Sequence, residues 1–121
     1  MEKIPARLFL LFVALLVPVL SHQPSLKPPF ELFPYQDKLF HMVEFGGLAL
    51  AMVLNRDLFR RIGGPWGMAV SGLLWAVLDE VHQSYVPGRD SSLQDLAADA
   101  VGLAAGILLF RVLLAGRRKD S

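Results

Sequence analysis

The apolar residues of this chain fall into four long blocks separated by polar segments, not into the short periodic groups of a soluble domain. The blocks are Leu8–Leu20, Leu39–Leu54, Trp66–Leu78 and Leu96–Leu114. A helix that crosses a bilayer needs roughly 17–25 largely apolar residues. The fourth block has that length, and the other three reach it only with polar residues at their ends. The pattern therefore predicts an all-α polytopic membrane protein whose four transmembrane helices form a compact bundle.

The first block has a second interpretation, because basic residues followed by an apolar run are also typical of a signal peptide. Lys3 and Arg7 precede the run, but Val19-Leu20-Ser21 is a poor cleavage site without the A-x-A pattern. Pro18 also lies late in the run. We favour a retained membrane helix, and a cleaved signal peptide stays the alternative.

The basic residues predict the direction of insertion, because cytoplasmic segments are enriched in Lys and Arg. With four spans and an inner N-terminus, most basic residues are cytoplasmic: Lys3, Arg7, Arg56, Arg60, Arg61, Arg111, Arg117, Arg118 and Lys119. The outer side holds Lys27, Lys38 and Arg89. We therefore expect a multi-pass membrane protein with both termini in the cytoplasm. Residues 55–65 are predicted to form a short inner turn.

Composition narrows the class of protein further. The chain has 121 residues, of which 54% are hydrophobic, with a formal net charge of +1 and no cysteine. This length suits one domain, residues 1–121. The near-neutral charge gives no basic footprint for nucleic acid, and the lack of cysteine excludes disulfides and thiolate metal sites. The expected partner is the lipid bilayer.

Three of the predicted helices carry a polar stripe near the outer end, at spacings that place its members on one helical face. A single carboxylate facing lipid costs on the order of 2.5–3.5 kcal/mol, so the stripes should turn inward around an outward-facing polar cavity. The candidate residues, including one from the outer loop, are Asp37, Lys38, His41, Glu44, Asp79, Glu80, Gln83, Arg89, Asp95 and Asp99.

Gly102 and Gly106 continue the stripe of the fourth block at a spacing of four residues. Such small-residue pairs allow two membrane helices to approach closely. We expect these glycines to pack helices, either within one chain or between chains of a homo-oligomer.

The candidate residues fit more than one chemistry. His41 with nearby carboxylates supplies the groups for acid/base catalysis, and imidazole and carboxylate also suit divalent ions. A hydrogen-bonded interhelical pair is the structural alternative, and Asp79 with Glu80 also fits a solvated helix end. The spacing matches no H-E-x-x-H motif, so we assign no metal ligand and no cofactor. Arg89 suits either an anionic ligand or a loop carboxylate.

Two segments carry a resemblance to a known family: DKLFHMVEF (Asp37–Phe45) and DEVHQSYVPGRDSSLQDLAADAVGLAAG (Asp79–Gly106). They resemble the VanZ-like membrane proteins, most strongly over residues 37–106. The family often has Asn where this chain has Asp99, and Tyr where it has Phe45. The resemblance implies a bacterial inner-membrane protein, sometimes linked to tolerance of lipoglycopeptide antibiotics such as teicoplanin. It implies no particular biochemical activity.

Three functions remain open at this level. The first is a non-enzymatic envelope protein whose cavity binds an amphiphile, either a lipid-linked cell-envelope precursor or the lipoglycopeptide, and so affects teicoplanin tolerance. The second is a small intramembrane enzyme acting on a lipid headgroup, with His41 as base and Asp79 or Glu80 as acid. The third is a scaffold whose polar stripes only specify helix packing.

Overall fold

The described part of the chain is entirely helical, which confirms the predicted all-α class. A computed structural model describes residues 3–21, 36–85 and 93–119, without the side chains of residues 20–21, 36–37 and 116–119. Its elements are α1 (Lys3–Ser21), α2 (Gln36–Leu54), the short 3-10 helix η1 (Arg56–Ile62), α3 (Pro65–Ser84) and α4 (Leu93–Lys119).

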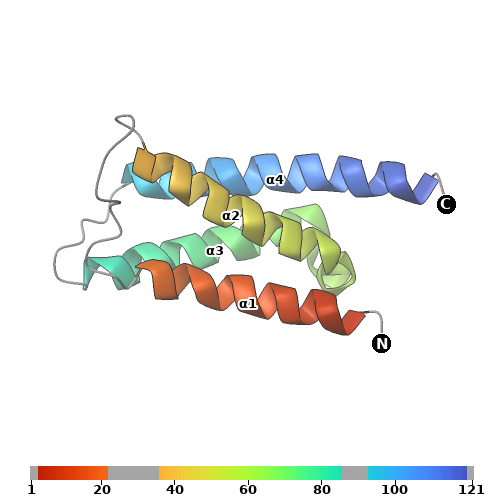
Figure 1. The fold of residues 1–121 in the computed structure, drawn as a ribbon, viewed down its shortest axis with the longest axis horizontal. Helices are drawn as coiled ribbons and strands as arrows, with labels where there is room; N and C mark the ends of the chain where they lie inside the picture. Colours follow the sequence, from red (N-terminus) through yellow and green to blue (C-terminus); the bar gives the residue numbers. More distant parts are fainter. Residues whose placement is uncertain (1–2, 22–35, 86–92, 120–121) are drawn as a thin grey trace.

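The four long helices run alternately up and down along one axis (Figure 1). At one end of the bundle α1 and α3 finish and α2 and α4 begin, and we call it the site end. At the opposite end α1 and α3 begin, α2 finishes and η1 follows, and we call it the basic end. The first turn of α1 and the last turn of α4 both lie toward the basic end (Figure 1).

Each helix is longer than the apolar block that predicted it. Helix α3 continues through the polar residues after Leu78 as far as Ser84, and α4 begins at Leu93, before the first acid of its stripe. The predicted inner turn contains η1. Gly63 and Gly64, with φ of 102° and 59°, reverse the chain between η1 and α3. Such left-handed angles are readily adopted only by glycine.

The outer surface of the bundle is apolar. Large hydrophobic side chains are exposed on all four long helices, among them Leu8, Phe12, Val43, Leu74, Leu108 and Val112. Soluble monomers rarely expose apolar surface on this scale. Apolar exposure on this scale is typical of membrane-associated proteins.

Length and composition together identify fewer candidate spans than the predicted four. Among the described residues, the segment Leu93–Ala115 of α4 is long and apolar enough to cross a membrane. The α2 segment from Lys38 qualifies only together with η1, from which it is bent by 84°. One or two candidate spans are therefore supported. The charged residues of the stripes lower the hydropathy of α2 and α3, and the count of four stays a prediction.

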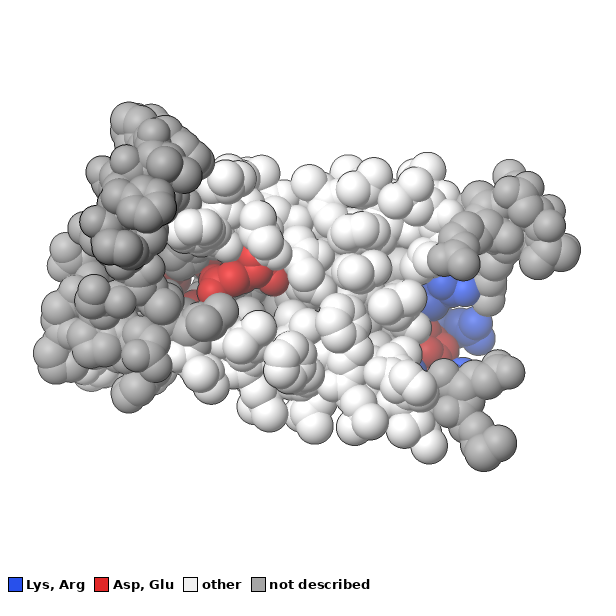
Figure 2. All heavy atoms as spheres, in the orientation of Figure 1, with Lys and Arg blue, Asp and Glu red and all other residues white. Residues whose placement is uncertain are grey.

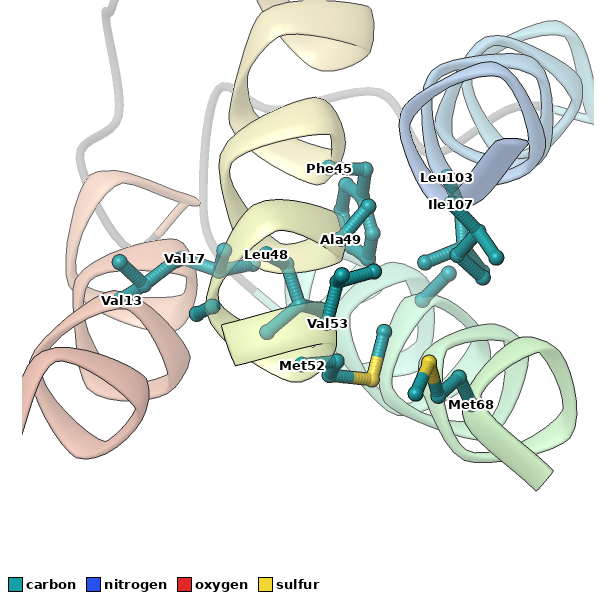
Figure 3. Packing of buried hydrophobic residues seen from close by; sticks show 12 residues of the cluster. Val13, Val17, Phe45, Leu48, Ala49, Met52, Val53, Met68, Leu103 and Ile107 are labelled. Atoms are coloured by element: carbon teal, nitrogen blue, oxygen red, sulfur yellow. The ribbon is translucent and has the colours of Figure 1, made fainter. Parts of the chain in front are cut away.

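Helix α2 lies at the centre of the hydrophobic core (Figure 3). Its Leu48 lies toward Val17 of α1, whereas its Phe45 lies toward Leu103 of α4 (Figure 3). Phe45 is fully buried and serves as a core side chain. The VanZ-like proteins that the sequence resembles often have Tyr at this position.

Two glycines of α4 allow it to approach α2 closely within the same chain. A Cβ atom added at Gly102 would lie 2.7 Å from the Cα atom of Met42, and one added at Gly106 would lie 2.7 Å from the Cβ atom of Ala49. Real Cβ atoms do not approach backbone this closely, so only glycine fits at position 102.

A proline in α1 leaves a backbone acceptor that α3 satisfies. Pro18 lies inside α1 and has no N–H to donate to the carbonyl four residues earlier, which belongs to Ala14. The indole Nε1 of Trp75 donates a hydrogen bond of 3.0 Å to that carbonyl oxygen. An unpaired buried carbonyl would be costly, so Trp75 joins α3 to α1 at the position where the helix needs a donor.

A polar network joins α1 to α2 and η1 at the basic end. Arg7 donates to both carboxylate oxygens of Asp57, at 3.1 and 2.5 Å, and to the side-chain oxygen of Asn55 at 2.6 Å. Asn55 is fully buried and donates to the carbonyls of Ala6 and Ala51. The hydrogen bonds from Arg7 are the main reason that the pKa of Asp57 lies below its usual range, and Lys3 contributes less.

We expect Gly102→Ala to destabilise the protein by about 1–3 kcal/mol, because the added methyl group overpacks the contact with the backbone of Met42. Gly47→Ala is the matched control, since a Cβ atom there meets nothing within 4 Å. The control should be neutral or up to about 1 kcal/mol more stable, because alanine is the better helix former. Thermal unfolding in detergent measures both. Equal stability of the two variants would contradict the close approach.

We expect Trp75→Phe to lower the free energy of unfolding by about 1–3 kcal/mol, because it leaves the Ala14 carbonyl unpaired. Pro18→Ala restores the backbone N–H that can bond to this carbonyl, so Trp75→Phe should cost less in that background. A double-mutant cycle measures the difference. Equal costs in the two backgrounds would show that Trp75 acts through packing alone.

Candidate functional site

The site end of the bundle encloses a cluster of buried polar side chains from three helices. Helix α2 supplies His41, α3 supplies Asp79, Glu80 and Gln83, and α4 supplies Asp95 and Asp99. Figure 2 shows acidic side chains at the surface toward this end, and basic side chains with an acidic one between them at the opposite end. We call these six residues the polar cluster.

The centre of the polar cluster is a pair formed by His41 and Asp99. The Nδ1 atom of His41 lies 2.8 Å from Oδ1 of Asp99, and both side chains are buried. Its other ring nitrogen, Nε2, lies 3.9 Å from Oδ1 of Asp95. A carboxylate bound to one nitrogen fixes the orientation of the ring and leaves the other nitrogen to act.

An ion pair lies beside this centre and joins the same two helices. Lys38 Nζ lies 2.5 Å from Oδ1 of Asp95. The Lys38 side chain is 20% exposed and that of Asp95 only 8%. Asp95 therefore has a lysine on one side and His41 on the other, and the negative charge of α4 is partly balanced by α2.

Helix α3 completes the polar cluster from a third direction. Gln83, which is fully buried, donates a hydrogen bond of 3.1 Å from Nε2 to Oδ2 of Asp79, one turn earlier in the helix. Glu80 lies near the pair formed by His41 and Asp99. Each of the three side chains has a donor atom within 4.8 Å of a donor atom of the other two. Three helices thus bring an imidazole and two carboxylates together.

Only one of the two carboxylate oxygens of Asp99 has a hydrogen-bond partner among the described residues. Its Oδ1 atom contacts His41, whereas its buried Oδ2 atom meets no hydrogen-bond partner among residues 3–21, 36–85 and 93–119. Buried oxygens are normally satisfied by protein, water or an ion. The feature therefore points to something bound at this position.

The remaining candidates have different positions. Glu44 is half-buried on α2, next to the polar cluster in sequence but less enclosed than His41. Asp37 belongs to α2, but its side chain lies outside the described residues, as does all of Arg89. The proposed roles of Asp37 and Arg89 stay predictions.

Helical spacing predicted that His41, Glu80 and Asp99 face one cavity. It did not single out these three as a group, because they come from three helices. A motif search detects ligands close together in sequence, whereas this arrangement depends on how the helices are rotated about their axes. The basic-end network was likewise not predicted, since its arginine was assigned only to topology.

Chemically, a buried imidazole oriented by a carboxylate, with a second carboxylate nearby, can do two things. It can accept and return a proton, as general bases do, or it can hold a cation. The described side chains at the site end include more acids than basic groups. Lys38 and His41 lie among the acids Glu44, Asp79, Glu80, Asp95 and Asp99. This charge balance favours a positively charged occupant.

Comparison with known proteins identifies the family. The family model described as VanZ/LLP1 matches residues 7–114, nearly the whole chain. The chain belongs to the VanZ/LLP1 family. No curated protein and no solved structure matches it significantly. The matched range includes all six residues of the polar cluster, and membership of this membrane-associated family agrees with the apolar exterior.

We expect His41 and Asp99 to be coupled in stability. Interhelical hydrogen bonds in membrane proteins contribute about 0.6 kcal/mol on average and up to about 1.7 kcal/mol, and a pair between potentially charged groups should lie near the upper value. A double-mutant cycle of His41→Ala and Asp99→Ala, measured by unfolding in detergent, gives the coupling energy. A cycle of His41→Ala with Arg111→Ala, at the far end of α4, is the control. Equal coupling in both cycles would contradict a specific pair.

Proposed function

We propose that this VanZ/LLP1 protein is a multi-pass protein of the bacterial inner membrane in which all four long helices cross the bilayer. The helices have 19, 19, 20 and 27 residues. At a rise of about 1.5 Å per residue, even the shortest approaches the roughly 30 Å of the hydrocarbon core. The basic end then faces the cytoplasm with both termini, as the distribution of Lys and Arg favours.

In this orientation the polar cluster faces the outside of the cell. The observation that carries the proposal is the burial of carboxylates and a histidine from three helices at one end of a bundle with an apolar exterior. Ionisable residues inside membrane segments are costly and usually mark a functional site. The function is binding at an outward-facing polar cavity.

The chemistry of the polar cluster suggests the kind of ligand. An excess of acids among the described side chains favours a headgroup with a positive charge, and the surrounding lipid favours an apolar tail. An amphiphile with an amino group has both features. A lipid-linked envelope precursor and a lipoglycopeptide such as teicoplanin belong to this class, and binding either one would alter tolerance of the antibiotic.

One observation favours a second candidate, an enzyme acting on a lipid headgroup. The contact between Asp99 and Nδ1 of His41 orients the ring as a general base is oriented in many active sites. The remaining ring nitrogen would then accept a proton from the substrate, and Glu80 would supply the acid. A change in lipid composition on overexpression would distinguish catalysis from binding.

We expect His41→Gln and Glu80→Gln to abolish the change in teicoplanin susceptibility that the wild-type protein confers on a host strain. Both remove a group of the polar cluster while roughly preserving side-chain volume. Arg111→Gln is the matched control, because it removes an exposed charge from the far part of α4 and should behave as wild type. Minimal inhibitory concentrations, with protein levels in membranes measured by immunoblot, provide the test.

The result separates the three functions. If both variants accumulate normally and retain wild-type susceptibility, the polar cluster is a packing scaffold and the binding proposal fails. If activity is lost and extracted lipids are unchanged, binding is supported. If activity is lost and wild-type expression alters a lipid, the enzyme replaces the binding protein.

A further inference from the structure

The group His41, Glu80 and Asp99 has the composition of a metal site. It contains one imidazole and two carboxylates, all buried, and each offers a donor atom within 4.8 Å of the other two. Three protein ligands with a further position left for water or substrate are typical of catalytic zinc sites. Imidazole with carboxylates also suits manganese and ferrous iron.

The distances are close to those that a bound ion requires. Ligand bonds of about 2.0–2.1 Å in a tetrahedral site separate the donor atoms by roughly 3.3 Å. The 2.8 Å contact between His41 and Asp99 would widen slightly, and Glu80 would move inward by a side-chain rotation. Helices α2, α3 and α4 already bring one donor atom of each residue to within 4.8 Å of the other two.

A second, independent observation points to a ligand at the same place. The Oδ2 atom of Asp99 is buried and has no hydrogen-bond partner in the described part of the chain. The side chain itself is 0% exposed. The contact with His41 accounts for one oxygen only. An ion between the three side chains would replace the hydrogen bond with Nδ1 and provide a partner for the Asp99 carboxylate.

The neighbouring residues are suited to support such a site. Asp95 lies 3.9 Å from Nε2 of His41 and is itself held by Lys38. Carboxylates around a metal-binding histidine orient its ring and increase its basicity. Lys38 balances the charge of Asp95, and the carboxylates of Glu80 and Asp99 would balance the two charges of a divalent ion.

We propose that His41, Glu80 and Asp99 bind a divalent transition-metal ion of the zinc or manganese type at the outer end of the bundle. The ion would connect three helices and present an open coordination position toward the outside. The inference rests on the proposed function for the outward orientation of the site, whereas metal binding itself is measured in purified protein.

The test uses the full chain, purified in detergent with an affinity tag that contains no histidine and stripped with a chelator. Zn²⁺ or Mn²⁺ is then added, excess metal is removed, and the bound metal is measured by inductively coupled plasma mass spectrometry. We expect about one ion per chain. Titration calorimetry should show at least tenfold weaker binding for His41→Gln and Glu80→Gln, because each loses one of three ligands.

Asp57→Asn is the matched control, because it changes an acid to an amide at the basic end of the bundle and should retain wild-type binding. Size-exclusion chromatography and circular dichroism establish that each variant is folded, and Asp99→Asn replaces any variant that is not. Zn²⁺ should also raise the melting temperature of the wild-type and control proteins, and not that of the ligand variants.

The proposal is overturned if neither Zn²⁺ nor Mn²⁺ is retained, if folded ligand variants bind as well as wild type, or if the protein binds only Ca²⁺. Its failure is separable from that of the proposed function. A wild-type protein that retains neither metal, but whose polar-cluster variants lose the effect on susceptibility, would overturn the metal site alone. If the wild-type protein binds the metal, but His41→Gln and Glu80→Gln affect susceptibility as the wild type does, the envelope function alone is overturned.

Discussion

The structure depends on one constraint: an ionisable side chain in an apolar surrounding must find its partner inside the protein. Exposure to hydrocarbon costs a carboxylate several kcal/mol, and this fixes the rotation of each helix about its axis. Helices α2, α3 and α4 turn His41, Asp79 and Asp99 inward, whereas apolar side chains such as Val43, Leu74 and Leu108 face outward. The bundle is apolar on its outer surface and polar inside at the site end. Elsewhere its interior is filled by the hydrophobic core, which includes Phe45, Leu48 and Leu103.

Close packing and the site are two consequences of the same helix contact. Gly102 lies three residues after Asp99, on the same face of α4, and it contacts the backbone of Met42, the residue that follows His41. The distance between the helix axes at the glycine therefore sets the distance between His41 and Asp99. A larger residue at position 102 would move α4 away from α2 and lengthen the hydrogen bond between them. The glycine is thus a positioning residue for the polar cluster, although it touches no ligand.

The sequence predicted which residues face inward, but not which of them meet. Helical periodicity alone put Asp79 and Gln83 on one face, and Asp95 and Asp99 on another, and all four are buried. The pairing of His41 with Asp99 depends on the register of α2 against α4. No local spacing in the sequence encodes this register. The bond from Trp75 to Ala14, which offsets the proline of α1, also joins segments far apart in the chain. Four spans were predicted from apolar blocks, whereas length and composition of the described residues support one or two, in α4 and in the bent pair of α2 and η1.

The same energetic argument bears on the choice between a scaffold and a binding site. A polar group that serves only to specify packing needs as many partners as it has hydrogen-bonding atoms, because each unpaired one costs stability. Asp95 with Lys38 meets this expectation. Asp99 does not: it is completely enclosed, it uses one oxygen for His41, and the other has no partner within the described residues. Asparagine at position 99, which is frequent in VanZ-like proteins, would keep an acceptor for His41 with one negative charge fewer. The proposed metal ion would give the second oxygen of Asp99 a partner, which helix packing among the described residues does not supply.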